Sequence, residues 1–528
     1  QASLARAFGI DVEEIDAAEI KRLWPIANTD DLIGGILSPS DGRVSSSDVC
    51  AALIKGARAG GVRVFEDTPV KGFTFANGRI SGVKTENGVI RCDAVALCGG
   101  LWSRAIARVA GVSAPLYACE HYALITKPFD GIYTGMPVLG AHDGYMYIRD
   151  EAQGLLVGSF EPNAKPVDLD QLPNDFSFDL LSENWDHFEP VMREALQRIP
   201  ALQTAEVRTL LNGPESFTLD GAFLMGEAPE VPGFFMCCGM NSMGVASSGG
   251  AGKALADWVV DGDSGVDLSS VDVRRFARMR DTLTAVRDRA AENLSLHYAI
   301  GYPGHEFATA RGLRLSPLHE RLVSLGAECG DRGGWERPSW FQPKGGGVST
   351  DLRFGKPHWF DCVAREHQAT REAVAVFDQT SFGKLLVQGR DAASFLDRVC
   401  AGRLDVPPGR ITYTPILNHR GGYESDVVAM RLREDAYLIV TGSGQQVRDM
   451  DLLRRRIGPD EFVTLADMTS AFAVIGVMGP NARDLLMRLS PNDLSNEAFP
   501  YMTHREVEIG HTVARAARIS YAGELGWE

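Results

Sequence analysis

One stretch, residues 213–262, constrains the fold of this chain more than any other. Phe234–Cys238 is a continuous apolar run, which is typical of a strand buried on both faces. After a glycine-containing loop, apolar residues recur at intervals of three and four: Ala251, Ala254, Leu255, Trp258 and Val259. This spacing predicts a helix with a single apolar stripe, and Gly262 is suited to end it.

The loop that joins this strand to this helix has the composition of a binding loop. It consists of Gly239, Met240, Asn241, Ser242, Met243 and Gly244. Glycines allow backbone N–H groups to approach a ligand closely, and the following helix N-terminus carries partial positive charge. The arrangement suits an anionic group, but an ordinary βα unit of an α/β protein has the same pattern, so the pattern alone leaves both interpretations open.

The exact residues of the segment 213–262 are more specific than its pattern of apolar positions. GPESFTLDG, GFFMCCGMNSMGVASSGG and AGKALADWVVDG resemble the C-terminal flavin-contacting segment of the amine-oxidising flavoproteins, in particular the dimethylglycine dehydrogenase and sarcosine dehydrogenase group. The resemblance implies FAD as a cofactor, with the loop at 239–244 against the pyrimidine end of the flavin ring. A fixed dipole there would stabilise the negative charge of a reduced flavin.

Two earlier segments, DTPV and ALCGGLWS, resemble other cofactor contacts of this family. They imply an adenine-side contact at Val70 and flavin-side contacts at Cys98, Gly99, Gly100 and Trp102. The helix after this second segment is expected to present Trp102, Ala105, Ile106, Val109 and Ala110 on one apolar face. The family's strand–GxGxxG–helix motif for the pyrophosphate is not found in the sequence. We therefore expect a fragment, truncated at both ends.

Residues 115–160 are expected to form the substrate face. PLYACEHYALITKP and HDGYMYIRDEAQGLLVGSFEP alternate between apolar and polar positions, which predicts antiparallel strands. Taken by itself, a histidine or tyrosine on a strand is more often structural. The family resemblance instead implies that His121 and Tyr147 are the active-site histidine and tyrosine.

The second half of the chain resembles a different family. GWERPSWF, within 326–343, resembles a middle-domain signature, and the series from Glu366 to Glu528 resembles the tetrahydrofolate-binding domain of the glycine-cleavage aminomethyltransferase. The resemblance implies that Asp426, in GGYESD, acts as a base near the reactive folate nitrogens. It also implies that Tyr413 and Tyr521 line the folate site and that Glu528 binds the pterin edge. Without the resemblance, a turn-capping role would be the first interpretation of Asp426.

These segments predict a multidomain chain of α/β and α+β class. We expect a partial FAD-binding oxidoreductase domain with an antiparallel substrate sheet at 1–262, a connector at 263–343 and a partial folate-binding domain at 344–528. We also expect a strand at VRVFED, 62–67, hairpins at 73–92, and helix N-caps among Ser46, Ser47 and Asp48.

Composition excludes several partners. The net charge of −16 argues against nucleic acids and anionic membranes. No apolar run approaches the ~18 residues of a membrane-spanning helix. The nine cysteines contain no C-x-x-C pair, so we expect buried, reduced thiols, no metal site, and a reducing compartment such as the cytoplasm or the mitochondrial matrix.

The leading functional hypothesis joins the two halves. An N-methyl amino acid of dimethylglycine or sarcosine type loses hydride to FAD, and tetrahydrofolate captures the resulting iminium as 5,10-methylenetetrahydrofolate. Oxygen or an electron-transfer flavoprotein would reoxidise the flavin. Two alternatives remain open: an aminomethyltransferase with a non-functional flavin half, and a folate-binding module without catalysis.

Overall fold

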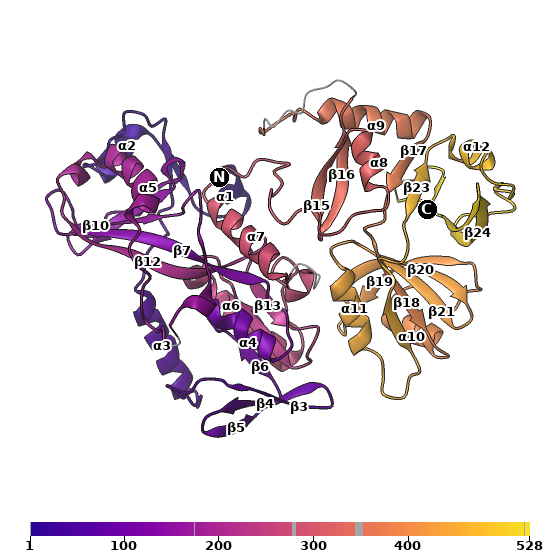
Figure 1. Ribbon diagram of the computed structural model, residues 1–528, viewed down its shortest axis with the longest axis horizontal. Coiled ribbons are helices and arrows are strands. Elements are labelled where there is room, and N and C mark those ends of the chain that lie inside the picture. Colours follow the sequence, from indigo (N-terminus) through magenta and orange to yellow (C-terminus); the bar gives the residue numbers. More distant parts are fainter. Residues whose placement is uncertain (1, 174, 277–280, 344–351, 522) are drawn as a thin grey trace. The chain divides into compact units, whose positions relative to one another are not determined.

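The computed structural model describes residues 2–173, 175–276, 281–343, 352–521 and 523–528 (Figure 1). The chain divides into two compact units. The first consists of Gln1–Val271 and Leu283–Ile300, and the second of Asp272–Thr282 and Gly301–Glu528. In the described part of the chain, we find no helix with the length and apolar character needed to cross a membrane.

The first unit is built on a six-stranded antiparallel sheet in the order β11-β7-β10-β9-β8, with β12 also paired to β7. The strands are β7 (Leu116–Thr126), β8 (Leu139–Ala141), β9 (Met146–Glu151), β10 (Gly154–Ser159), β11 (Pro166–Val167) and β12 (Val207–Thr218). The antiparallel strands predicted within 115–160 are thus present. One face, with Tyr122, Leu124 and Ile148, packs on α5 (Trp185–Arg198) and forms a large apolar core. α7 (Leu283–Ser295) contacts β7 and β12.

A smaller sheet contains the strand of the βα unit predicted within residues 234–262. β14 (Phe234–Cys238) pairs in parallel with β6 (Val95–Leu97) and antiparallel with β13 (Leu224–Glu227). α6 (Gly244–Asp261) follows β14, and its Ala251, Ala254 and Leu255 are buried. Gly262 takes a left-handed conformation with φ of 77° and donates its N–H to the Trp258 carbonyl, which ends the helix as predicted.

The remaining elements of the first unit are short. The hairpins predicted at 73–92 are present as β3 (Gly72–Ala76), β4 (Arg79–Thr85) and β5 (Gly88–Arg91). The others are α1 (Ala2–Ala7), β1 (Glu13–Ile15), α2 (Ala17–Leu23), β2 (Gly35–Leu37), α3 (Ser46–Ala59) and α4 (Ser103–Val109).

Four local expectations were wrong. The segment 62–67 forms no strand: its residues are exposed, and no described strand pairs with it. The N-cap of α3 is Ser45, whose side chain accepts from the Asp48 N–H. In α4 the buried residues are Ser103, Arg104 and Ala107, and of the predicted apolar face only Ala110, at the C-cap, is buried, because the face that a helix buries is set by the segments packed against it. The thiols are not all buried, since Cys50 and Cys98 are exposed.

The second unit contains a five-stranded antiparallel sheet in the order β19-β20-β21-β18-β22. The strands are β18 (Gly383–Gln388), β19 (Ile411–Leu417), β20 (Tyr423–Arg433), β21 (Ala436–Thr441) and β22 (Thr464–Asp467). α10 (Ala392–Val399) and α11 (Gln446–Arg455) contribute Phe395, Leu396 and Leu453 to its core.

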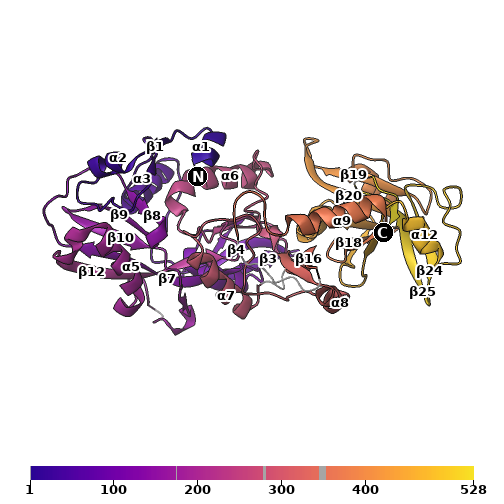
Figure 2. The same cartoon turned by 90° about the horizontal axis from the view of Figure 1, so that it is seen from above.

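Smaller elements complete the second unit. β17 (Ala375–Asp378), β23 (Ile475–Met478) and β26 (Gly526–Trp527) form a three-stranded sheet. The hairpin of β24 (Thr503–Ile509) and β25 (Thr512–Arg518) lies beside α12 (Ala482–Met487) in both views (Figures 1 and 2). The others are α8 (His319–Ser324), β15 (Ala327–Arg332), β16 (Trp335–Phe341) and α9 (Phe360–Glu372).

Candidate active sites

His121 lies on β7 beside a buried carboxylate. Its Nδ1 is 3.6 Å from Oε2 of Glu161. The other carboxylate oxygen of Glu161 accepts hydrogen bonds from the Tyr122 N–H at 3.1 Å and from the Ser159 hydroxyl at 2.5 Å. Glu161 is 1% exposed. One oxygen of this carboxylate is therefore fixed by the protein, and the other is available to the imidazole.

The surroundings of His121 raise its pKa. Burial by itself lowers the pKa of the imidazole, but the neighbouring Glu161 carboxylate, assisted by Glu215, outweighs burial. The net result is a pKa above the usual value for histidine. His121 is thus a stronger base than an ordinary histidine, and its protonated form is paired with Glu161.

Glu215 connects the His121 strand to the loop before α6. β12 pairs with β7 so that Gly213 lies opposite His121 and Glu215 opposite Cys119. Since alternate residues share a face, Glu215 lies on the face of His121, one diagonal step away. Its Oε2 accepts a hydrogen bond of 2.5 Å from the Ser242 hydroxyl. The structure therefore brings the predicted catalytic histidine and the predicted cofactor loop together through one carboxylate.

Tyr147 lies on β9, where its ring crosses a glycine of the next strand. Gly158 of β10 is the register partner of Tyr147, and a Cβ added there would lie only 2.1 Å from Cζ of the ring. Burial raises the pKa of Tyr147. Phe160 lies near both predicted residues, with its ring centroid 4.8 Å from that of His121 and 6.3 Å from that of Tyr147. His121 and Tyr147 thus belong to one cluster.

Sequence reasoning missed several members of this cluster. His297 stacks on Phe160 at 4.2 Å between centroids, and Tyr298 lies 4.4 Å from Phe160 and stacks on His142 at 4.2 Å. Phe160 and Glu161 could have been suggested by SFEP at the end of a predicted strand. His297 and Tyr298 gave no local signal, because they follow α7 and reach the cluster only through its packing.

The loop 239–244 has the backbone of a binding loop. Gly239 has φ of 66°, and a Cβ there would lie 2.8 Å from Cγ2 of Thr218. Asn241 is buried with φ of 49°, accepts from the Thr218 N–H at 2.8 Å and donates to the Gly239 carbonyl at 2.6 Å. At the N-cap of α6, Met243 makes no side-chain capping bond. The first N–H groups of the helix are therefore without a side-chain cap.

The segment 98–102 follows the strand parallel to β14. Because β6 and β14 are parallel neighbours, the segments after their carboxyl ends lie at the same edge of the sheet, where ligands of α/β sheets bind. Gly100 has φ of 54°, and Trp102 is 46% exposed. The neighbouring Cys237 thiol lowers the pKa of Cys98 to about 7. Val70 is also exposed but lies in the segment leading into β3.

These features fit a flavin. The left-handed residues of the loop, the uncapped helix N-terminus and the exposed indole of Trp102 offer dipoles and an apolar surface at one sheet edge. The Ser242–Glu215 bond places this edge next to the His121 cluster. The residues expected to bind the flavin ring therefore lie next to those expected to accept the substrate proton.

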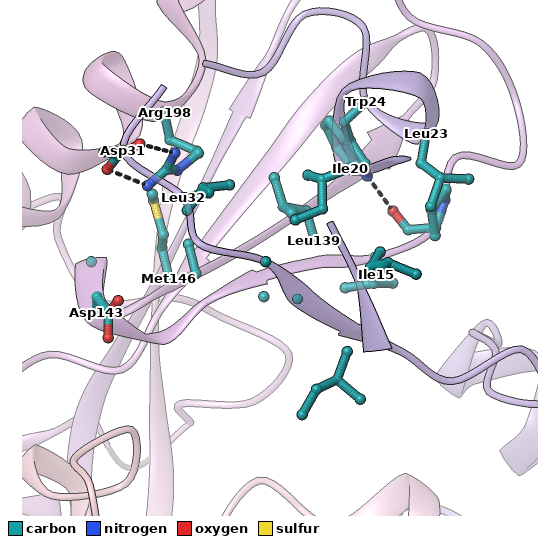
Figure 3. Close-up of a pocket in the computed structure, with 18 of the residues that line it drawn as sticks. Ile15, Ile20, Leu23, Trp24, Asp31, Leu32, Leu139, Asp143, Met146 and Arg198 are labelled. Atoms are coloured by element: carbon teal, nitrogen blue, oxygen red, sulfur yellow. Dashed lines mark hydrogen bonds and ion pairs between the residues drawn. The ribbon is translucent and has the colours of Figure 1, made fainter. Parts of the chain in front are cut away.

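A cavity of about 470 Å³ in the same unit lies on the other face of the six-stranded sheet (Figure 3). Its wall includes Met146, which precedes Tyr147 on β9 and therefore points to the opposite face. Figure 3 shows Arg198 paired with Asp31 through two nitrogens, and it shows the indole N–H of Trp24, which donates to the Pro137 carbonyl at 2.9 Å. This cavity is separate from the His121 cluster.

In the second unit, Asp426 and Tyr413 form a hydrogen-bonded pair. Tyr413 of β19 donates its hydroxyl to Oδ2 of Asp426 on β20 at 2.9 Å. This bond, and then one to Tyr423, raises the pKa of Tyr413. Tyr413 and Tyr423 are both exposed. Asp426, Tyr413 and Tyr423 thus present a carboxylate and two aromatic rings, an arrangement suited to a flat, hydrogen-bonding ligand.

The other two predicted folate residues lie elsewhere in the unit. Glu528 accepts a hydrogen bond of 3.3 Å from Gln379, and burial raises its pKa. Tyr521 is 99% exposed. Of the four residues, Tyr413 and Asp426 are in direct contact, and Tyr423, which the resemblance did not indicate, lies next to Tyr413.

Three family models together match nearly the whole length of the chain. Residues 1–258 match "FAD dependent oxidoreductase", 261–316 match "FAD dependent oxidoreductase central domain" and 318–528 match "GCVT N-terminal domain". The first and third domains indicate FAD and tetrahydrofolate as cofactors. The fused order of an amine-oxidising flavoprotein and a folate-binding domain is thus confirmed.

Three curated relatives cover nearly all of the chain. It is 39% identical to 4-methylaminobutanoate oxidase (formaldehyde-forming) of Paenarthrobacter nicotinovorans, over 98% of this chain and 63% of the relative. It is 34% identical to human mitochondrial sarcosine dehydrogenase, over 100% of this chain and 62% of the relative. It is 36% identical to the mitochondrial pyruvate dehydrogenase phosphatase regulatory subunit of Mus musculus, over 99% of this chain and 61% of the relative. The chain therefore spans less than two thirds of the length of these relatives.

Proposed function

The chain belongs to the flavoproteins that join an FAD dependent oxidoreductase domain, a central domain and a GCVT-type domain, and from this premise we propose that it oxidises an N-methyl amino acid and passes the one-carbon unit to tetrahydrofolate. The product would be 5,10-methylenetetrahydrofolate. Sarcosine, dimethylglycine and 4-methylaminobutanoate are the candidate substrates. A reducing compartment, either the cytoplasm or the mitochondrial matrix, is the proposed location.

His121 has the central role in the first reaction. Only the free amine has a lone pair that assists loss of hydride, so the substrate ammonium must first lose a proton. His121 accepts this proton, and Glu161 stabilises the imidazolium that results. When bound, FAD would supply the acceptor for the hydride. Tyr147, held across Gly158, orients the substrate on the same face.

Asp426 has the central role in the second reaction. The iminium left by hydride loss is electrophilic, and attack by a folate nitrogen releases a proton. The Asp426 carboxylate accepts this proton, while Tyr413 fixes its Oδ2. Because the two sites share one chain, the effective concentration of the iminium at the folate site is raised, and less of it hydrolyses to formaldehyde.

One observation carries this proposal: Glu215 lies next to His121 on the substrate sheet and accepts from Ser242 in the cofactor loop. The test is a substrate panel on the full-length, flavin-containing protein under anaerobic conditions, with bleaching of the flavin absorbance as the readout. Sarcosine, dimethylglycine and 4-methylaminobutanoate are compared with glycine, which has no N-methyl group. Bleaching by an N-methyl compound but not by glycine supports the proposal, and its absence for all of them contradicts it.

A non-catalytic role is the second candidate, because one relative is named as a regulatory subunit. In that case the chain would bind folate or a partner without oxidising an amine. The His121–Glu161 pair favours the catalytic proposal, since a buried carboxylate that raises the pKa of a histidine is typical of functional sites. The same panel separates the two candidates: a regulatory protein that retains flavin would remain oxidised with every amine.

A further inference from the structure

Two buried cations in the second unit have no carboxylate partner. Arg314 is 9% exposed and Lys384 is 1% exposed. In the described ranges neither forms an ion pair with Asp or Glu. A buried charge without a counter-ion is costly, so buried arginines and lysines are normally paired. The Asp467 carboxylate acts on both cations, and Asp378 acts on Lys384, from beyond ion-pair distance. The lack of a direct counter-ion points to an anion supplied from outside the chain.

The Arg314 guanidinium is held by neutral groups. It donates to the Ser470 hydroxyl at 2.7 Å and to Oε1 of Gln446 at 3.3 Å, and it lies 4.1 Å from the Trp335 ring centroid. These two bonds use only part of its fork of donors. The nearest link to a carboxylate is indirect, because Gln446 donates in turn to Asp467. The guanidinium is thus fixed in place while retaining donors for a ligand.

A cavity opens beside this guanidinium. Its volume is about 210 Å³, and Arg314, Trp335, Thr380, Ser470 and Phe472 line it, together with Leu315, Pro317 and Ala473. Lys384 lies directly behind the wall, where its Nζ donates to the Thr380 carbonyl at 2.7 Å. Burial, and then the charge of Arg314, lowers the pKa of Lys384 to about 8. The Arg314 guanidinium therefore lines the cavity, and the Lys384 ammonium lies next to one of its lining residues.

We propose that this cavity is a binding site for a small carboxylate with a short apolar body, held by Arg314 and the Ser470 hydroxyl between Trp335 and Phe472. The carboxylate matches the planar fork of the guanidinium. The volume lies below the roughly 300–1,000 Å³ of sites for drug-sized ligands, so it suits a small acid rather than a whole folate. The site is independent of the oxidation and of the Tyr413–Asp426 pair.

The test is isothermal titration calorimetry on the full-length protein with benzoate, butanoate and inorganic phosphate. Wild type should bind benzoate or butanoate more tightly than phosphate. Arg314→Met, which keeps an unbranched chain against Trp335 but removes the charge, should weaken this binding at least tenfold. The matched control is Arg332→Met, at an exposed arginine paired with Glu306, and it should bind like wild type.

Ala473→Leu provides a second variant in case Arg314→Met does not fold. Ala473 is exposed and lines the cavity, so a larger side chain there should block binding without affecting the fold, as checked by circular dichroism. Three results would overturn the proposal: no binding of either carboxylate by wild type, tighter binding of phosphate than of both carboxylates, or carboxylate binding that survives in both Arg314→Met and Ala473→Leu.

Discussion

The Ser242 hydroxyl donates a 2.5 Å hydrogen bond to the Glu215 carboxylate, and this bond joins the loop before α6 to the strand beside His121. Ser242 belongs to a loop whose residues fit a flavin. Glu215 contributes to the raised pKa of His121. The cofactor loop and the predicted base are therefore coupled electrostatically as well as by position.

Replacing Ser242 should weaken this coupling. Ser242→Ala removes a hydrogen bond to a charged acceptor, a class of bond that contributes about 1.5–3 kcal/mol. Since the bond is only partly buried, we expect about a tenfold loss in the rate of flavin reduction, measured by anaerobic stopped-flow absorbance. Ser248→Ala is the control, because the Ser248 hydroxyl donates to the Val245 carbonyl within α6. Equal rates for both variants would show that the bond has no role in the reaction.

His121→Ala should affect the oxidative half-reaction alone. A positioned general base contributes about 10²–10⁴-fold, and flavin reduction should slow by this amount. Folate binding, measured by fluorescence titration, should stay unchanged, because it takes place in the other unit. The control is His511→Ala, at an exposed histidine in the β24–β25 turn. An unchanged reduction rate would assign His121 a structural role.

The pH profile of flavin reduction should report the His121–Glu161 pair. The pKa of His121 is raised, and only the neutral imidazole can accept a proton, so the rate should increase with pH through a value above about 6.5, the ordinary histidine pKa. Glu161→Gln removes the charge that stabilises the imidazolium. The midpoint should then move to lower pH by about one unit or more. A midpoint that stays in place would mean that another group controls the profile.

The contact between Gly158 and Tyr147 predicts a packing defect. Gly158→Ala would place a methyl group 2.1 Å from the Tyr147 ring, so the ring must move. Overpacking of this kind costs about 1–3 kcal/mol, and flavin reduction should slow as well. Thermal unfolding of the flavin domain provides the stability readout. Gly56→Ala in α3, where a Cβ meets nothing within 4 Å, should instead raise stability by about 0.5–1 kcal/mol.

The sequence predicted features that depend on local patterns. The strand Phe234–Cys238, the end of α6 at Gly262 and the Asn77–Gly78 turn each follow from residues that are adjacent or at helical spacing. His121 and Tyr147 were selected by family resemblance, and the structure places them in one cluster. Their assignment as catalytic residues stays a prediction.

Features that depend on long-range packing could not be predicted in the same way. His297 reaches Phe160 only because α7 packs against the sheet. Glu215 becomes important only through the register of β12 on β7. α4 buries Ser103, Arg104 and Ala107 rather than the predicted face, since the face that a helix buries is set by the segments packed against it. In each case the deciding contact joins different segments of the chain.

The central claim is that one chain couples amine oxidation at one site to folate capture at another, and the Asp426→Ala variant tests it most directly. The measurement is the ratio of formaldehyde to 5,10-methylenetetrahydrofolate formed by the full-length protein at saturating tetrahydrofolate. The control is Asp435→Ala, at an exposed aspartate that pairs with Arg433 beside the β20–β21 turn. We predict normal flavin reduction, normal folate affinity and a large increase in the formaldehyde share for Asp426→Ala alone. If Asp426→Ala still transfers every one-carbon unit to folate, or loses amine oxidation as well, the two-site account is contradicted.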